Sequence, residues 1–330
     1  MDRLRISLAC QNSDRTRALI DGRVAIEGVD ANWVPVDPEE IFHRAFRHQE
    51  FDVCEISLAT HLTLTARDGS PFVGVPAFLS RAFRHSAIYV RAGGEVKEAA
   101  ALAGRRVGVP DYQQTAALWV RGMLLDDHGV HPRDVTWLAG GLEERGREMR
   151  TKISLPPEIS VAAIPPDRTL SAMLAAGEID AIVSPRAPSC FTDGSGRAVR
   201  LFPDHRAAEE AYFRKHGHFP LMHAVGIRRD LHARHPWLAA SLMKAFVEAK
   251  EIAFADMRQT NYMRASLPWL AADVARVQAV LGADYWRYGV AESRGELEAM
   301  ARYALTDGLA PRLVAPEELF AASTIGMFRR

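Results

Sequence analysis

Short apolar runs alternate along this chain with segments that have the period of an α-helix, and this alternation constrains the fold more than any other feature. The clearest helical segment covers residues 237–257, where Leu238, Leu242 and Phe246 fall on one face. The apolar runs predict strands at 4–9, 52–56, 72–76, 86–91, 106–110, 135–138, 179–184 and 224–228. Strands that alternate with helices in this way predict an α/β fold, with parallel strands covered by helices on both faces.

The length of the chain indicates more than one domain. It has 330 residues, of which 48% are hydrophobic and 25% are charged. These proportions are typical of a globular protein, and the length is enough for a large core but long for a single one. We therefore expect two domains or lobes.

Charge and hydropathy exclude several classes of partner. Basic and acidic residues number 41 each, so no overall field favours nucleic acid or an anionic membrane. Residues 1–20 contain no apolar stretch of signal-peptide length, and no later segment is long and apolar enough to span a bilayer. We expect a cytoplasmic protein that binds neither nucleic acid nor membrane.

Motifs of cofactor and metal chemistry are absent from the sequence. It contains no Gly-x-Gly-x-x-Gly fingerprint, no Walker-type phosphate loop and no Gly-x-Ser-x-Gly nucleophile elbow. Cys10, Cys54 and Cys190 are too widely spaced for a disulfide framework or a metal site, and the histidine-rich stretches lack a carboxylate at zinc-ligand spacing. We expect buried, reduced cysteines, no metal and no organic cofactor.

A basic cluster stands directly before the predicted strand at 86–91. Arg81, Arg84 and His85 bring two planar guanidinium groups and one imidazole together, and such groups bind carboxylates and exchange protons near neutral pH. Arg186, held between prolines after another strand, is a further positioned arginine. The cluster predicts a site for an acidic ligand. A solvated basic turn with a capping histidine is the commoner origin of any single cluster of this kind.

Polar residues also follow two other predicted strands, where open α/β sheets bind ligands. Glu55 is a carboxylate at an otherwise apolar strand end, which favours a functional role. Ser57 either caps the next helix or contacts a ligand, and the two interpretations are about equal. The stretch 10–16 offers helix caps or ligand contacts, and capping is the better interpretation for Ser13 and Asp14.

The loop 108–115 lies between a predicted strand and a predicted helix. This arrangement can bind an anion, although it is a common connection in α/β proteins. Tyr112, Gln113 and Thr115 make this loop rich in donors that could orient a phenol or a carboxylate. We interpret Arg121, on the following helix, as a surface residue.

The sequence contains five short segments in a specific order: FDVCEIS at 51–57, SRAFRHS at 80–86, GRRVGVPDYQQT at 104–115, GEIDA at 177–181 and FPLMH at 219–223. Together they resemble the 4,5-dihydroxyphthalate decarboxylase family, and the resemblance spans nearly the whole chain. It implies the fold of the type II periplasmic binding proteins, in which two α/β lobes are joined by two hinge strands around a central cleft.

The resemblance also implies a division of the chain. Residues 1–90 and 222–330 would form one lobe, and residues 91–221 would form the other. The two hinge strands would then bring His85 and His223 to one cleft.

The activity implied by the resemblance is that of an aromatic carboxy-lyase, which converts 4,5-dihydroxyphthalate to 3,4-dihydroxybenzoate and carbon dioxide. Direct loss of carbon dioxide from an arene requires protonation of the ring carbon, because an aryl anion would otherwise form. We expect His85 or His223 to donate this proton, with Glu55 as the alternative acid.

The other candidate residues are expected to bind a small aromatic diacid. Arg84 or Arg186 would bind the retained carboxylate, and Arg81 is the less favoured third candidate. Glu55 and Tyr112 would form hydrogen bonds with the ring hydroxyls. The leaving carboxylate should lie in a drier place, since a salt bridge would stabilise the ground state. The full set of expected substrate ligands is Arg81, Arg84, Ser57, Tyr112, Gln113, Thr115 and Arg186.

A second class of function fits the same fold. A non-catalytic solute-binding protein could carry or sense an aromatic acid, because fold does not imply function. The lack of a signal peptide weighs against a periplasmic carrier, and the two histidines favour proton transfer. An enzyme of related chemistry on another hydroxybenzoate is a weaker alternative, and homo-oligomerisation is left open.

Overall fold

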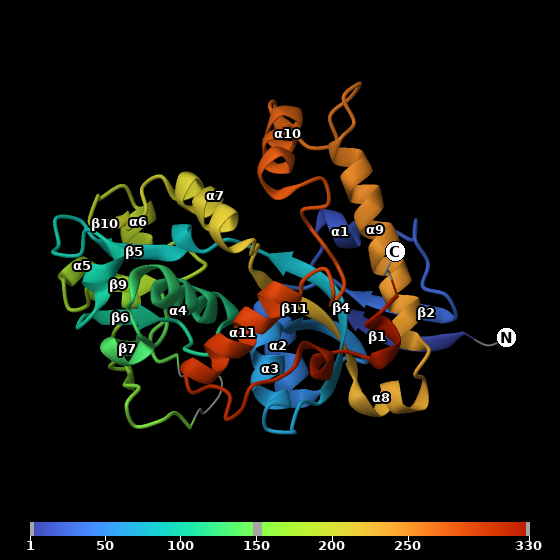
Figure 1. The fold of residues 1–330 in the computed structure, drawn as a ribbon, viewed down its shortest axis with the longest axis horizontal. Helices are drawn as coiled ribbons and strands as arrows, with labels where there is room; N and C mark the ends of the chain where they lie inside the picture. The colour runs from blue at the N-terminus through green and yellow to red at the C-terminus, as the bar shows by residue number, and fades with distance from the viewer. Residues whose placement is uncertain (1–2, 148–153, 328–330) are drawn as a thin grey trace. The chain divides into compact units, whose positions relative to one another are not determined.

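The computed structural model describes residues 3–147 and 154–327, and the chain divides into two compact units (Figure 1). Unit 1 consists of Met1–Arg81, Leu221–Leu297 and Val314–Arg330, and unit 2 consists of Ala82–Pro220 and Glu298–Leu313. The largest differences from the expected lobes are residues 82–90 and 298–313, which belong to unit 2. Each unit is built around one β-sheet.

The sheet of unit 1 has five strands in the order β2 (Val29–Val34), β1 (Leu4–Ala9), β3 (Val53–Ser57), β11 (Leu221–Arg228) and β4 (Phe72–Arg81). The first three strands are parallel, but β11 runs antiparallel to both β3 and β4. The expectation of parallel strands is therefore wrong for β11. The reason is connectivity, because β4 and β11 are the two arms of a hairpin into whose connection most of unit 2 is inserted.

The helices of unit 1 are α1 (Asp14–Ile20), α2 (Pro38–His48), α3 (Leu58–Thr65), α8 (Arg229–Arg234), α9 (Leu238–Met257) and α10 (Leu270–Leu281). The apolar face predicted for the longest helix is confirmed, since Leu238, Leu242 and Phe246 are fully buried on α9. This helix lies alongside α1 (Figure 1).

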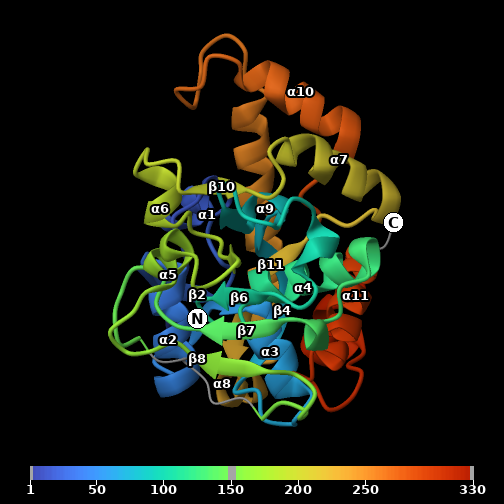
Figure 2. The same ribbon diagram turned by 90° about the vertical axis from the view of Figure 1, so that its left-hand side faces the viewer.

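The sheet of unit 2 has six strands in the order β10 (Ala198–Arg200), β5 (Ile88–Arg91), β9 (Ala181–Val183), β6 (Arg106–Val109), β7 (Thr136–Ala139) and β8 (Val161–Ala163). Figure 2 shows β6, β7 and β8 side by side, and these strands are parallel. Strand β5 is antiparallel to both of its neighbours, so this sheet is also mixed.

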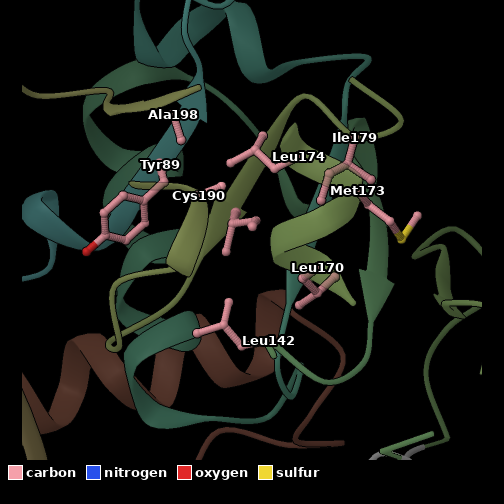
Figure 3. Close-up of a cluster of buried hydrophobic side chains, with 9 residues drawn as sticks. Tyr89, Leu142, Leu170, Met173, Leu174, Ile179, Cys190 and Ala198 are labelled. Atoms are coloured by element: carbon pink, nitrogen blue, oxygen red, sulfur yellow. The ribbon is translucent and has the colours of Figure 1, made fainter. Parts of the chain in front are cut away.

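The helices of unit 2 are α4 (Thr115–His128), α5 (Leu170–Ala176), α6 (Ser189–Thr192) and α7 (His205–His216), and α11 (Arg294–Thr306) begins in unit 1 and continues into unit 2. Figure 3 shows a hydrophobic cluster of this unit, in which Leu170 and Leu174 of α5 pack with Ile179, Tyr89 and Cys190. All three cysteines are free and buried, as expected.

All eight predicted strands are present, with ends shifted by up to five residues. Three strands were not predicted, namely β2, β8 and β10. β8 and β10 have only three residues each, too few to form a clear apolar run. β2 lies at a sheet edge and alternates between apolar and polar residues, so it also lacks such a run. Within the described ranges, no helix is both long and apolar enough to cross a membrane.

Candidate active site

One edge of the unit 1 sheet gathers several of the predicted site residues. Strands β1, β3 and β4 end at this edge, and the antiparallel strand β11 begins there. The chain also leaves unit 1 and returns to it at this edge, after Arg81 and before Leu221. Open α/β sheets bind ligands beyond the carboxyl ends of their strands, so this edge is where a site is expected.

Glu55 and His223 form a close pair at this edge. Nδ1 of His223 lies 2.6 Å from Oε1 of Glu55. The register explains the contact: His223 lies opposite Ser57, and Glu55 is two residues from Ser57 and therefore on the same face of the sheet. The carboxylate is fully buried, whereas 18% of the histidine side chain is exposed.

The pairing assigns the tautomer of His223. An ionised carboxylate can only accept hydrogen bonds, so Nδ1 carries a proton and donates a hydrogen bond to Glu55. The ring edge of Phe42, on α2, packs against the imidazole with ring centroids 4.7 Å apart. Nε2 makes no hydrogen bond to any of the described residues. His223 thus has one nitrogen held by a carboxylate and one nitrogen that is available for chemistry.

Gln11 holds the second oxygen of Glu55. Its backbone N–H donates to Oε2 at 3.0 Å, and its side-chain amide donates to the carbonyl of Leu79 at 3.2 Å. Sequence reasoning missed this residue, because the stretch 10–16 was interpreted mainly as helix caps. That interpretation is confirmed for Ser13, the N-cap residue of α1. The position of Gln11, just after the first strand, was the only signal for its role.

Ser57 occupies the helix-cap position considered for it, and its contact with a ligand stays a prediction. It ends β3 and is the N-cap residue of α3, but its side chain makes no capping bond to a backbone N–H. Its Oγ accepts a hydrogen bond from Thr60 Oγ1 at 3.1 Å, and the residue lies opposite His223 on the neighbouring strand. Ser57 is therefore a helix-terminal residue beside the Glu55–His223 pair.

Arg81 is an internal residue of unit 1. Its side chain is fully buried, where Nη1 forms an ion pair with Glu296 at 3.1 Å. Nη2 donates to Ser293 Oγ and to the carbonyl of Arg287, both at 2.6 Å. Burial lowers the pKa of Arg81 to about 10, against the opposing effect of Glu296. These bonds hold Arg81 in place inside unit 1, and its role as a substrate ligand stays a prediction.

His85 belongs to unit 2 and occupies a 3-10 helix, His85–Ala87, instead of a strand. Its ring is buried and packs edge-on against Phe202 and Tyr212, at centroid distances of 5.1 and 5.4 Å. Burial lowers the pKa of His85 to about 4, so the ring is neutral near pH 7. A neutral imidazole is a far weaker acid than an imidazolium, which disfavours His85 as the proton donor.

Arg84, the residue before His85, is half-buried in unit 2. Its Nε is buried and has no hydrogen-bond acceptor in the part of the chain that the structure describes. Burial lowers the pKa of Arg84 to about 10, and the nearby carboxylate of Glu209 opposes this shift. Arg186, by contrast, is exposed after β9, and its backbone N–H donates to Ser184 Oγ at 3.2 Å.

Tyr112 lies inside unit 2 against a buried arginine. The guanidinium of Arg121 stacks on its ring at 3.8 Å, and Trp137 packs edge-on at 5.8 Å. Its hydroxyl is buried without an acceptor among the described residues, and burial raises its pKa. The interpretation of Arg121 as a surface residue is wrong, because it forms a fully buried ion pair with Asp307 at 2.6 Å.

Gln113 and Thr115 are also buried in unit 2. The backbone N–H of Gln113 donates to Asp111 Oδ1 at 3.2 Å, and Thr115 is the first residue of α4. The predicted residues therefore fall into two groups. Unit 1 brings Glu55, Ser57 and His223 together, and Arg81 lies deeper in the same unit. Unit 2 holds Arg84, His85, Tyr112, Gln113, Thr115 and Arg186.

Among the residues that the structure describes, no three or more His, Cys, Asp or Glu side chains lie together in a way that could hold a metal ion. In unit 1, Glu55 holds the His223 ring at Nδ1, and an imidazole in this position is a group that can exchange a proton at Nε2.

Solved structures show a likeness in fold. The periplasmic sulfonate-binding protein SsuA of Methylobacillus flagellatus matches with a TM-score of 0.55 and 16% identity, over 98% of this chain and 93% of that one. The periplasmic aliphatic sulphonate-binding protein SsuA of Escherichia coli matches with a TM-score of 0.53 and 14% identity, over 98% and 99%. The predicted periplasmic-binding-protein-like α/β fold is therefore confirmed.

Sequence comparison is more specific, although no protein-family model matches the chain. The chain is 48% identical to the 4,5-dihydroxyphthalate decarboxylase of Pseudomonas putida over 214 residues, and these residues cover 65% of this chain and 83% of that protein. It is 40% identical over 329 residues to the 4,5-dihydroxyphthalate decarboxylase of Comamonas testosteroni, over the full length of both. The chain therefore belongs to the 4,5-dihydroxyphthalate decarboxylase family.

Proposed function

We propose that this protein is a carboxy-lyase that converts 4,5-dihydroxyphthalate to 3,4-dihydroxybenzoate and carbon dioxide. The observation that carries the proposal is the pair of Glu55 and His223, at 2.6 Å, on the strand-end edge of a chain whose two curated relatives are both named for this activity. The pair supplies the acid that such a reaction requires.

The reaction begins with proton transfer to the ring. The His223 imidazolium donates the proton on Nε2 to the ring carbon that bears the leaving carboxylate. The hydroxyl para to this carbon supports the step by releasing electron density into the ring. The bond to the carboxyl carbon then breaks, its electron pair returns to the ring, and carbon dioxide leaves. His223 becomes neutral, with Nδ1–H still bound to Glu55, and takes a new proton from solvent to restore the imidazolium.

Glu55 acts through His223 in this scheme. Its buried carboxylate fixes the ring orientation and stabilises the imidazolium that must exist before proton transfer. Gln11 keeps the carboxylate in place through its backbone N–H. Proton donation by His223, and not by His85, is also supported by the environment that keeps His85 neutral.

The substrate is a dianion, so cationic groups are needed to bind it. Of the three arginines that the sequence predicted, Arg84 is the strongest candidate for this role, because it is half-buried and its Nε has no acceptor among the described residues. A guanidinium of this kind gains a charge-assisted hydrogen bond when a carboxylate arrives. The other residues of the predicted set remain proposed ligands of the substrate, namely Ser57, Arg81, Tyr112, Gln113, Thr115 and Arg186.

The test is incubation of the purified protein with 4,5-dihydroxyphthalate, while ring absorbance and released carbon dioxide are followed together. We expect both signals to change at the same rate and 3,4-dihydroxybenzoate to accumulate. The His223→Asn variant serves as the control for contaminating activity. Saturable binding of the diacid without any product would contradict the proposal and would support a carrier function instead.

A further inference from the structure

Arg15 is an arginine of unit 1 that no sequence pattern indicated. It is the second residue of α1, and its guanidinium is held in one orientation. Nε and Nη2 donate to the carbonyl of Leu79 at 3.3 and 3.1 Å, and Nη1 donates to Asp14 Oδ1 at 2.5 Å. The guanidinium also stacks on the ring of Trp286 at 4.0 Å. Only 14% of the Arg15 side chain is exposed.

A chain of hydrogen bonds connects Arg15 to the Glu55–His223 pair. The Leu79 carbonyl that binds Arg15 also accepts the side-chain amide of Gln11. The backbone N–H of Gln11 in turn donates to Glu55. Gln11 therefore links the two groups at this edge of the unit 1 sheet. Its side-chain amide shares the Leu79 carbonyl with Arg15, and its backbone N–H binds the Glu55 carboxylate.

Two further observations place Arg15 near this pair. Leu79 precedes Ser80, which lies opposite His223 in the sheet register. The Tyr288 hydroxyl is buried, and this burial raises its pKa; the charges of Arg15 and Glu55 have smaller effects on the same pKa, the first lowering it and the second raising it. Its oxygen has no hydrogen-bond partner in the described part of the chain.

The guanidinium of Arg15 has donors left for a ligand. Of its five N–H groups, three make the bonds described above, and the other two have no acceptor among the described residues. Asp14 offsets part of its charge, but this partner is 43% exposed, and an exposed pair of neighbours is weak. Because the stacked fork is already ordered, it loses little conformational entropy when it binds a carboxylate.

We propose that Arg15 binds the retained carboxylate of the aromatic diacid, so that one unit of the protein carries both the proton donor and a carboxylate ligand. This inference rests on the proposed decarboxylase function, since it concerns the same site. Arg15 differs from Arg81 in exposure, although both arginines are anchored within unit 1: 14% of the Arg15 side chain is exposed, whereas the Arg81 side chain is fully buried.

The test is calorimetric binding of phthalate, which has both carboxylates and no ring hydroxyl, and of catechol, which has the hydroxyls and no carboxylate. We expect Arg15→Gln to raise the Kd of phthalate by about 10- to 100-fold, the usual range for charge-assisted hydrogen bonds, and to change that of catechol less than about twofold. Arg15→Lys should recover part of the affinity, because it keeps the charge but loses the fork.

Arg17→Gln is the matched control, because it removes one exposed arginine from the same helix and should leave both affinities unchanged. Unchanged phthalate affinity in Arg15→Gln would overturn the inference. So would an equal loss of phthalate and catechol binding together with a lower melting temperature, which would make Arg15 a structural residue. Phthalate binding that depends on Arg15, in a protein without decarboxylase activity, would leave this inference standing and contradict only the proposed reaction.

Discussion

His223 and His85 are two histidines that the sequence presents as equal candidates, and the structure places them in opposite environments. His223 lies at a strand-end edge of unit 1, where one nitrogen is held by a carboxylate and the other makes no hydrogen bond to a described residue. His85 lies in unit 2 among aromatic rings, with a pKa lowered to about 4 by burial. A histidine can act as an acid near neutral pH only when its charged form is stabilised and one of its nitrogens is accessible.

The same contrast separates buried ion pairs from groups available to a ligand. Arg121 and Asp307 in unit 2 form an almost completely buried ion pair, and both Nη atoms of Arg121 are buried without a partner among the described residues. Arg15 in unit 1 is anchored and also keeps two unused donors, but 14% of its side chain is exposed. The identity of a residue is therefore a weak guide to its role, and the exposure of its unused donors is a better one.

The largest effect is expected when the two histidines are replaced separately. His223→Asn should lower kcat by about two to four powers of ten, the usual range for loss of a general acid, with little change in substrate affinity. His85→Asn should change kcat far less, because its ring is already neutral. Steady-state kinetics of both variants check this. Near-normal turnover in His223→Asn would contradict the proposal that His223, and not His85, is the proton donor.

Asp307→Ala tests whether the buried ion pair of Arg121 and Asp307 is needed for the stability of the protein. It leaves the Arg121 guanidinium buried without its counter-ion, which should cost about 3–5 kcal/mol of stability. Thermal unfolding followed by calorimetry measures this. Asp193→Ala is the matched control, because it removes one carboxylate from an exposed pair with Arg197 and should change the melting temperature little. A similar small change in Asp307→Ala would show that the buried pair is not needed for folding.

Glu55→Gln tests whether the carboxylate of Glu55 acts through His223 or binds the substrate directly. The amide keeps the size of the side chain but cannot stabilise an imidazolium by charge, so kcat should fall by about a hundredfold. Phthalate affinity should stay within about threefold, since Glu55 does not contact the carboxylates in this scheme. If phthalate affinity falls as much as kcat, Glu55 is a binding residue and not a residue that acts through His223.

Acid stability depends on histidines buried in the neutral form. Burial lowers the pKa of His61 and of His85 to about 4, and their ordinary value is 6.5. The unfolded chain therefore binds protons between pH 6.5 and 4 that the native protein does not, so stability should fall as pH decreases through this window. The loss is on the order of 1–3 kcal/mol for each histidine.

His85→Phe tests this dependence in unit 2, because phenylalanine fits an aromatic environment and cannot titrate. Its melting temperature should fall less between pH 7 and pH 4.5 than that of the unaltered protein. An identical fall in both proteins would mean that His85 contributes nothing to acid sensitivity.

The smallest effect is expected at the two arginines of unit 2. Arg84→Gln should raise KM by about tenfold, because a half-buried guanidinium makes strong charge-assisted bonds. Arg186→Gln should change KM by less than about threefold, because exposed charges are screened by solvent. Kinetics at constant ionic strength compare the two. Equal effects would show that burial does not distinguish these arginines.

Much of the fold could be predicted because strand-forming runs are strong local signals. The predicted strand at 4–9 coincides with β1, and the predicted helical face of α9 is buried. The orientation of β11 could not be predicted in this way. It depends on the insertion of unit 2 between β4 and β11, which is a property of topology and leaves no local pattern. The cytoplasmic location stays a prediction.

The candidate site could be predicted only in part. Glu55 and His223 were both named from the sequence, but their contact joins residues 168 positions apart and depends on the register of β3 and β11. Arg121 was interpreted as exposed, since nothing local indicates that Asp307 neutralises it. Gln11 and Arg15 were missed because short polar stretches after a strand are usually caps, and only the long-range bonds to Glu55 and Leu79 distinguish them.

The claim that the ring carbon is protonated in the chemical step can be tested most directly in heavy water. The measurement is the single-turnover rate of decarboxylation of 4,5-dihydroxyphthalate by the unaltered protein, at matched pH and pD. If a proton from His223 reaches the ring before carbon dioxide leaves, the single-turnover rate should be clearly lower in heavy water. Identical rates in the two solvents would contradict rate-limiting proton transfer to the ring and, with it, the role proposed for the Glu55–His223 pair.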